Sequence, residues 1–421
     1  MTKLAVDGGE KACTGEWPRW PVWDDTERKA LLGVLESGAW WYGERVAEFE
    51  RKFAEFQGAR FGVTATSGTT ALEAALQALG VGAGDEVIVP PYTFVATASA
   101  VLRVNAVPIF ADIQPRTLCI DPDDVERKIT PRTKAVIPVH LGGRVADMDR
   151  LSAIARARSL HLVEDACHSW GSQWKGKGTG AIGDCGVFSF QASKNITSAE
   201  GGIVLTDDGE LAERVRSITN CGRRKGEAWY RHFVVGSNLR LTEFQAALLL
   251  AQIGRLEEQT LTRQSNADIL TEGLRRIPGI ITIENEPRMT RRGYHLYCFR
   301  LDLPVLGVDR ARFMQALLAE GVPLMAGYDT PLYRNPMFGR AEDGPRGCPV
   351  SCPYYAGNVD YTTVSCPVCE QVCEDTCWIF HTLLLAEPSA MRGIVGAVSK
   401  VCEHFVRENG RGNARGSRGR G

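Results

Sequence analysis

A single lysine and a single aspartate stand where a carbonyl cofactor would need them. Lys194 lies in a stretch of small and polar residues between an apolar run and two glycines, FSFQASKNITSAEGG (188–202), and Asp165 ends the apolar run LHLVEDA (160–166). Burying that carboxylate costs free energy unless a cation or hydrogen bonds meet it. Pyridoxal phosphate requires both a lysine for its Schiff base and an acid opposite its pyridinium nitrogen. Alone, each residue also fits an ordinary role, a solvated lysine or a helix N-cap.

A phosphate site is indicated by the segment ATSGTTALEAAL (65–76). Its small residues precede a helical pattern, so backbone N–H groups of Gly68 and Thr69 would meet an anion at the positive end of the helix dipole. Ser189 lies five positions before Lys194 and has a hydroxyl to add. A capped helix and a strand serine give the same patterns without any ligand.

Two ring-bearing residues complete the predicted cofactor shell. Phe94, in PPYTFVATASA (90–100), is positioned to stack on a pyridine ring, although an aromatic residue there also suits a core. His168 follows Asp165 by three residues and has a ring N–H to offer a phenolic oxygen. A buried structural histidine is the alternative for that position.

The elements that must position these residues alternate between helical and β-type patterns from about residue 25 to 260. Amphipathic or helical periodicity predicts helices at 24–38, 46–59, 69–80, 148–160, 210–219 and 241–279. Short apolar, β-branched runs predict strands at 86–91, 107–113, 134–140, 160–166, 186–190 and 201–207. This alternation predicts a doubly wound α/β domain with a mostly parallel sheet. Ligands of such sheets bind beyond the carboxyl ends of the strands.

The chain length of 421 residues exceeds what one core supports, so we expect two domains. The predicted division is a large α/β domain at 1–262 and a smaller α+β domain at 263–407. The last residues, 408–421, are mostly glycine and arginine and predict a disordered tail.

The composition of the chain limits the kinds of binding partner that we expect. A formal net charge of −1 provides no long-range field for nucleic acid or an acidic membrane. Neither a secretory leader nor an apolar run of spanning length is apparent, so we expect a cytoplasmic protein. Thirteen cysteines, an odd number, fit reduced thiols better than a disulfide framework.

Together these segments resemble the DegT/StrS family of pyridoxal phosphate-dependent sugar aminotransferases, which have the aspartate aminotransferase fold, fold type I. The resemblance runs through VPIFADI, LVEDACHSWG, GDCGVFSFQASKN, AEGGIVLTDD and GSNLRLTEFQAAL, in the family's order. It implies a Schiff base on Lys194, Asp165 at the pyridinium nitrogen and His168 at the phenolic oxygen. It also implies phosphate contacts from Gly68, Thr69 and Ser189, ring stacking on Phe94, and a contact from Asn238 of a neighbouring subunit to the phosphate. The resemblance therefore implies a homodimer with a shared site.

The reaction implied by the resemblance is amino transfer from glutamate or glutamine to a keto sugar or keto cyclitol. Lys194 argues against the family's sugar dehydratases, in which a histidine replaces the lysine. The segments 327–338 and 377–386 resemble the branch that holds amino-hydroxybenzoate synthases and cyclitol aminotransferases. Candidate substrate contacts, each equally compatible with a packing role, are Tyr294, His295, Tyr328, Tyr333 and His381.

A cysteine-rich segment offers a competing interpretation. Six cysteines lie within thirty residues: Cys348, Cys352, Cys366, Cys369, Cys373 and Cys377. Such density is typical of zinc or iron–sulfur sites and would make the small domain a metal-binding interaction module. The four-residue recurrence of the last three, however, predicts one buried face of a helix, where cysteine acts as a small apolar residue. We therefore expect no metal. A DNA-binding regulator is disfavoured because no helix-turn-helix pattern precedes residue 25.

Overall fold

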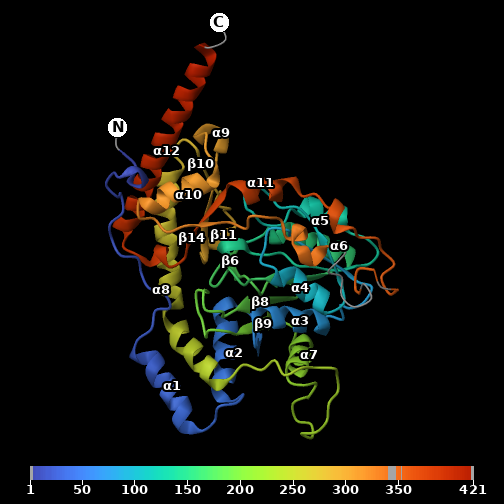
Figure 1. Ribbon diagram of the computed structural model, residues 1–421. Coiled ribbons are helices and arrows are strands. Elements are labelled where there is room, and N and C mark those ends of the chain that lie inside the picture. The colour runs from blue at the N-terminus through green and yellow to red at the C-terminus, as the bar shows by residue number, and fades with distance from the viewer. Residues whose placement is uncertain (1–2, 340–347, 352, 419–421) are drawn as a thin grey trace.

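A seven-stranded sheet forms the centre of the larger part of the molecule in the computed structural model, which describes residues 3–339, 348–351 and 353–418 (Figure 1). Its order is β1-β9-β8-β5-β4-β2-β3. The strands are β1 (Phe61–Ala65), β2 (Glu86–Val89), β3 (Val107–Phe110), β4 (Thr133–Val136), β5 (His161–Asp165), β8 (Cys185–Ser189) and β9 (Gly202–Thr206). Only β9 runs antiparallel to its neighbours, β1 and β8, within this sheet. The mostly parallel α/β prediction is confirmed, and β1 is a strand that the sequence patterns did not predict.

Helices cover both faces of this sheet (Figure 1). They are α2 (Glu44–Gln57), α3 (Gly68–Ala78), α4 (Ala96–Arg103), α5 (Pro122–Lys128), α6 (Met148–Arg158) and α7 (Gly209–Thr219), with α1 (Asp25–Ser37) preceding them. On one face, Phe49 and Phe53 of α2 meet Phe188 and Phe190 edge-on, with ring centroids 5.1–5.2 Å apart. Since side chains alternate along a strand, these two phenylalanines leave Ser189, between them, directed to the opposite face.

The long helix α8 (Glu243–Leu274) joins the two parts of the molecule (Figure 1). The predicted boundary near residue 262 therefore lies inside one continuous helix. Beyond α8 a four-stranded antiparallel sheet has the order β10-β12-β14-β13. Its strands are β10 (Ile280–Thr282), β12 (Leu296–Leu301), β13 (Met325–Ala326) and β14 (Thr376–Phe380), and its helices are α9 (Leu303–Leu306), α10 (Arg310–Ala319), α11 (Pro367–Asp375) and α12 (Pro388–Arg418). A small three-stranded sheet, β11 (Met289–Arg291), β6 (Gln173–Trp174) and β7 (Lys177–Gly178), lies between the two parts of the chain.

Packing between the two parts does not follow the order of the chain. At the N-terminus, Leu4 is buried in the small-domain core, and Ala5 N–H donates to Glu320 Oε1 at 2.8 Å. In the other direction, Cys369 N–H at the start of α11 donates to Asp112 Oδ1 at 2.9 Å, and Asp112 follows β3 of the large sheet. The segment predicted to lie wholly in the small domain is thus anchored to the large one.

Two further sequence predictions differ from the structure. Helix α12 continues to Arg418 and projects from the molecule, so the part of the predicted tail from 408 to that residue is helical (Figure 1). Extending a helix that is already packed costs much less than nucleating one, which explains the continuation. The helical pattern also placed Cys377 on a helix, which is wrong. Helix α11 ends at Asp375, and the run TCWIF that contains Cys377 pairs with β12 as strand β14.

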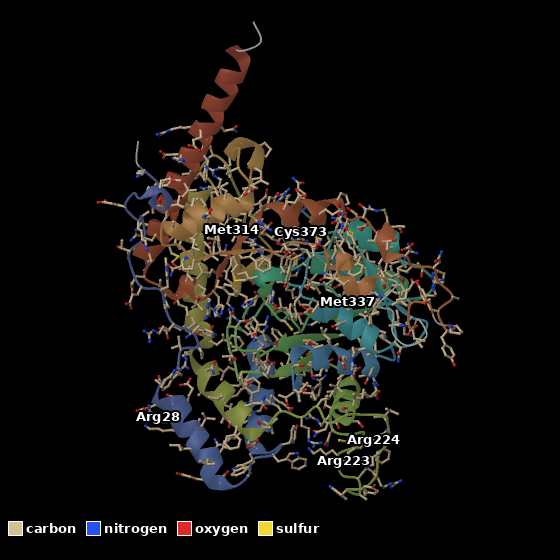
Figure 2. All side chains as sticks on the ribbon, viewed as in Figure 1. Arg28, Arg223, Arg224, Met314, Met337 and Cys373 are labelled. Atoms are coloured by element: carbon tan, nitrogen blue, oxygen red, sulfur yellow. The ribbon has the colours of Figure 1, made fainter. Side chains whose placement is uncertain are left out.

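Four of the six cysteines of this region are buried, and Cys348 is half-buried. Cys366, Cys369, Cys373 and Cys377 are at most 2% exposed, and the sulfurs of Cys369 and Cys373 lie 3.9 Å apart on one face of α11. Cys373 is labelled in Figure 2. Cys352 lies outside the described residues. In the part of the chain that the structure describes, no group of three or more histidine, cysteine or acidic side chains is arranged to hold a metal ion. None of the helices within residues 3–339, 348–351 and 353–418 combines the length and apolarity needed to cross a membrane.

Candidate active site

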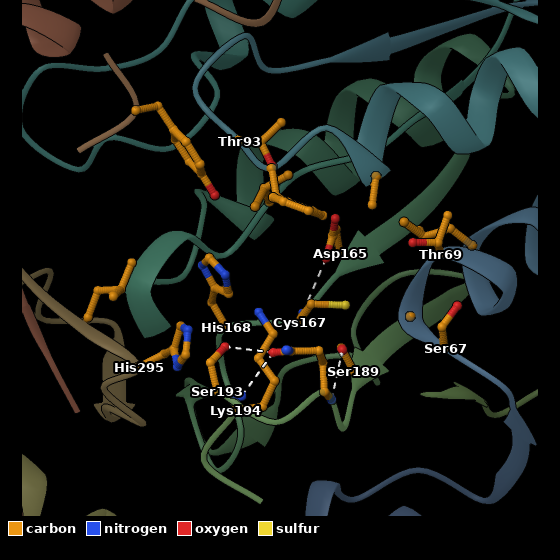
Figure 3. Close-up of a pocket in the computed structure, with 18 of the residues that line it drawn as sticks. Ser67, Thr69, Thr93, Asp165, Cys167, His168, Ser189, Ser193, Lys194 and His295 are labelled. Carbon is orange, nitrogen blue, oxygen red and sulfur yellow. Dashed lines mark hydrogen bonds between the residues drawn. The ribbon is translucent and has the colours of Figure 1, made fainter. Parts of the chain in front are cut away.

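A cavity of about 530 Å³ opens at the carboxyl edge of the large sheet, between it and the small sheet. Its size falls within the range of roughly 300–1,000 Å³ that small-molecule sites have. One side is polar and comes from the large domain: Ser67, Gly68, Thr69, Asp165, His168, Ser189 and Lys194. The other side comes from the small domain: His295, Leu296, Met325, Tyr328, Trp378 and Phe380. Sequence positions more than 300 residues apart therefore share one cavity (Figure 3).

Lys194 sits on the loop between β8 and β9. Its backbone N–H donates to the Gln191 carbonyl at 2.9 Å, which closes a tight turn, and its Nζ lies 5.8 Å from the centre of the Trp170 ring. Burial lowers the pKa of Lys194 below its usual range, and the nearby Cys167 and Asp165 partly oppose that shift. A larger fraction of this amine is therefore unprotonated near neutral pH than for an exposed lysine, and the unprotonated amine is the nucleophile.

Asp165 ends β5 and is 5% exposed. Its Oδ2 accepts a hydrogen bond from Thr97 Oγ1 at 2.8 Å, and its Oδ1 accepts one from Cys167 N–H at 3.2 Å. The second contact closes a turn; the chain from Asp165 to β6 (Gln173–Trp174) contains no helix, so Asp165 is not the helix N-cap that the sequence left open. The carboxylate nevertheless faces the cavity, as Figure 3 shows. Thr97 was not predicted, because its hydroxyl reaches Asp165 across 68 positions of sequence.

The adjacent Glu164 shows why only one carboxylate of this strand serves the cavity. Strand alternation directs Glu164 to the opposite side, where it is fully buried and accepts hydrogen bonds from three backbone N–H groups, those of Gly180, Ile182 and Gly183, at 2.6–2.8 Å. Its Oε2 also lies 2.8 Å from His140 Nε2. Glu164 is thus a structural residue that is fully satisfied by its own domain.

The start of α3 forms a cradle at the cavity. Ser67 caps the helix by accepting from Thr70 N–H, which leaves the N–H groups of Gly68 and Thr69 at the open end. A Cβ on Gly68 would lie 2.9 Å from Ser189 Cβ and 3.1 Å from Cys167 Sγ, so a side chain there would push the helix away from β8. Free N–H groups at a helix N-terminus with a serine hydroxyl alongside suit a phosphate.

The two predicted ring contacts also border the cavity. Phe94 is 59% exposed, although large aromatic side chains are usually buried, and it forms part of the cavity wall. His168 Nδ1 accepts from Gly142 N–H at 3.4 Å, so its Nε2 carries the hydrogen and can donate to an oxygen. Burial, and secondarily Lys194, lowers the pKa of His168 well below its usual range, which keeps this ring neutral.

The predicted substrate contacts divide into two groups. His295 and Tyr328 line the cavity. Tyr294 instead packs in the small-domain core, and Tyr333 donates its hydroxyl to Glu370 at 2.6 Å. His381 lies behind the lysine loop, with its Nε2 3.0 Å from the Ser193 carbonyl oxygen.

Asn238 is exposed and does not line the cavity of its own chain. Wall residues that the sequence analysis missed include Cys167, Leu296, Met325, Trp378 and Phe380. A strand pattern at 376–380, with Trp378 and Phe380 two residues apart, was the available signal for the last two.

The polar groups that face this cavity fit pyridoxal phosphate. An amine of lowered pKa, a buried carboxylate, an N–H donor from a neutral histidine and a helix N-terminus closed by Gly68 all face one cavity. These are the groups by which proteins bind and tune that cofactor. Fold and site together define a pyridoxal phosphate-dependent transferase of fold type I.

Comparison with known proteins gives the family. The DegT/DnrJ/EryC1/StrS aminotransferase family matches residues 21–377, and the chain belongs to that family. The protein is an aminotransferase. A relative from Micromonospora echinospora, described as a putative L-glutamine:3-amino-2,3-dideoxy-scyllo-inosose aminotransferase, is 39% identical over 96% of this chain and 98% of its own.

A second relative and a solved structure are synthases of 3-amino-5-hydroxybenzoate. The 3-amino-5-hydroxybenzoate synthase of Amycolatopsis mediterranei (strain S699) is 38% identical over 88% of this chain and 93% of its own. A crystal structure of 3-amino-5-hydroxybenzoic acid synthase superposes with a TM-score of 0.83 at 35% identity, covering 92% of this chain and 99% of that one.

Proposed function

We propose that this protein transfers an amino group from glutamine to a keto cyclitol, with pyridoxal phosphate held covalently on Lys194. The observation that carries the cofactor part is Lys194 itself, an amine of lowered pKa in the same cavity as the buried Asp165. The names of the relatives that match nearly the whole chain support the donor and the acceptor. Glutamate is the alternative donor, and a keto sugar the alternative acceptor.

Each cavity residue has one task in this proposal. Gly68, Thr69 and Ser189 hold the phosphate, and Phe94 covers the ring. Asp165 keeps a proton on the ring nitrogen, and its orientation is fixed by Thr97 and the Cys167 N–H. When bound, the cofactor supplies an electron sink for the bond broken at the substrate carbon. Once the donor's amine has displaced it from the cofactor, Lys194 Nζ would accept the proton released from the donor's α-carbon and pass it to the cofactor within the same half-reaction; the acceptor half-reaction would run these proton transfers in reverse.

The small-domain wall presents aromatic rings to the cavity, which suit the C–H face of a cyclitol ring. Tyr328 and Trp378 stand perpendicular, with ring centroids 4.8 Å apart, and present apolar surface to the cavity.

The first experiment establishes the cofactor and the reaction together. Purified protein supplied with pyridoxal phosphate is expected to gain a near-visible absorption band, and borohydride is expected to fix the added mass on the Lys194 peptide. Glutamine and a keto cyclitol should then yield the amino cyclitol, measured by mass spectrometry. An aromatic product would instead place the protein with the synthases. A protein that takes up no pyridoxal phosphate contradicts the proposal.

We further propose that the working unit is a homodimer in which Asn238 of one subunit meets the cofactor phosphate of the other. Asn238 is exposed and outside its own cavity wall. The loop before it, which carries Arg223 and Arg224, lies at the end of the molecule opposite α12 (Figure 2). Trp229 and Tyr230 on that loop are 72% and 78% exposed, which is unusual for a monomer surface.

Sedimentation equilibrium is the measurement for the dimer. We expect twice the chain mass of 46.1 kDa at micromolar concentration. Replacing Trp229 and Tyr230 with serine together should shift the equilibrium toward monomer and weaken phosphate binding, measured by pyridoxal phosphate titration. A wild-type protein that stays monomeric at these concentrations would rule out the shared site.

A further inference from the structure

His295 has a ring nitrogen that the rest of the protein leaves available. The residue immediately precedes β12 and is 3% exposed, yet it belongs to the cavity wall. Its backbone is fixed on both sides, because its N–H donates to the Gly142 carbonyl and its carbonyl accepts from His381 N–H, each at 3.0 Å. The ring lies beside that of His168, with centroids 4.5 Å apart (Figure 3).

Asn195, the residue after Lys194, determines which nitrogen carries the hydrogen. Its Nδ2 donates to the Tyr294 carbonyl at 2.9 Å, and a carbonyl can only accept. The other amide atom, Oδ1, therefore faces His295 Nδ1 at 3.0 Å and can only accept in turn. His295 must donate through Nδ1, and as a neutral ring it carries a lone pair on Nε2.

The surroundings keep this ring neutral. Burial lowers the pKa of His295 well below its usual range, and His168, Lys194, His381 and Arg263 add to the effect. His381 stacks on the far side with ring centroids 5.3 Å apart, and Arg263 is fully buried. No acidic side chain among the described residues contacts His295 to oppose these groups; its polar partner is the neutral Asn195. None of the described protein groups donates a hydrogen bond to Nε2, so the lone pair is left for what occupies the cavity.

We propose that His295 is a specificity-determining residue whose Nε2 accepts a hydrogen bond from a hydroxyl group of the acceptor ring. This inference rests on the proposed function. The keto oxygen of an acceptor and the carboxylate of an amino-acid donor offer no hydrogen, so neither can pair with this lone pair. A ring hydroxyl can. His295 would thus distinguish an acceptor ring that carries a hydroxyl group at this place from one that lacks it.

Two matched substitutions of His295 distinguish the roles of its two ring nitrogens. Asparagine reproduces Nδ1 and its link to Asn195 but has no atom at Nε2, whereas glutamine places an oxygen acceptor near the Nε2 position. His295→Asn is expected to lower kcat/KM for scyllo-inosose about 10- to 100-fold, the effect of one lost hydrogen bond in a buried site. His295→Gln should recover most of that loss. The loss in the glutamine half-reaction should be at least ten times smaller, measured by single-turnover spectroscopy.

A set of acceptors that each lack one hydroxyl then identifies the partner group. The penalty of His295→Asn should disappear for the one acceptor that lacks the hydroxyl paired with Nε2. An equal penalty on every acceptor would assign His295 a packing role and overturn the inference. A larger loss with glutamine than with the cyclitol would mean that Nε2 meets the glutamine amide, which overturns it as well.

Nitrogen-15 NMR of histidine-labelled protein without cofactor tests the structural basis separately. We expect the shift of a non-protonated Nε2 and a protonated Nδ1 for His295, assigned by its loss in His295→Asn. The opposite tautomer would overturn the inference even if amino transfer occurs. If wild-type protein fails to react with glutamine at all, the proposed function fails, and the NMR result still decides the tautomer.

Discussion

Replacing Lys194 with alanine is expected to abolish amino transfer, with kcat lowered by at least about 10⁴-fold. Two functions are lost together: the covalent link to the cofactor, and the amine that carries the proton. Positioned proton transfer by itself typically contributes 10²–10⁴-fold, so the loss of both sets this lower bound. The measurement is amino cyclitol formed from glutamine and keto cyclitol by the Lys194→Ala protein saturated with pyridoxal phosphate.

The matched control is Lys175→Ala. Lys175 is exposed and forms an ion pair with Asp149 at 2.7 Å, away from the cavity wall, so we expect activity within about twofold of wild type for a surface pair of this kind. Thermal unfolding temperatures of both variants equal to that of the wild type would show that the fold is intact. Turnover that survives in Lys194→Ala would reject the assignment of the catalytic amine.

The sequence predicted residues that the structure brings to the polar side of the cavity, because local rules determine where each of them lies. Lys194, Asp165 and Ser189 lie at or just beyond the carboxyl ends of strands that their own apolar runs define, and Gly68 opens a helix that its own periodicity defines. In a parallel sheet these ends meet at one edge, so the cofactor's chemical requirements could be matched to residue types without tertiary information.

The small-domain side of the cavity depends on strand pairings that no local sequence pattern contains. His295 and Phe380 meet because β12 and β14 pair across about 80 positions, and Asn195 reaches His295 from a loop of the other domain. Tyr294 precedes His295 directly but turns into the small-domain core, since successive residues of an extended chain point to opposite sides. Residue type alone could not separate these two neighbours.

In the cysteine-rich segment, strand pairing with distant parts of the chain outweighs the local helical pattern. A four-residue recurrence correctly predicted that Cys369 and Cys373 share a helix face, but Cys377 lies in a run of β-branched and aromatic residues. There the hydrogen bonds of two neighbouring strands, β12 and β13, outweigh the helical spacing. Strand β14 in turn brings Trp378 to the cavity. The change from helix to strand after Asp375 therefore explains both the wrong prediction for Cys377 and the position of Trp378 in the small-domain wall.

Asp165→Asn is expected to lower kcat about 10³-fold while leaving the fold intact. Asparagine has the size of aspartate and keeps an oxygen for the Thr97 hydroxyl, but its NH₂ group replaces the oxygen that accepts from Cys167 N–H, a loss of about tenfold. It also has no negative charge to hold a proton on the ring nitrogen, and buried charge pairs of this kind contribute several kcal/mol. The partner variant Thr97→Val removes one hydrogen bond to the carboxylate and retains its charge, so its loss should be nearer tenfold. Stopped-flow spectroscopy of the glutamine half-reaction compares the two directly. Losses within about tenfold of each other would mean that Asp165 acts by orientation, because asparagine also loses the Cys167 N–H bond. The expected gap of about a hundredfold exceeds that one bond, and the excess is assigned to the charge.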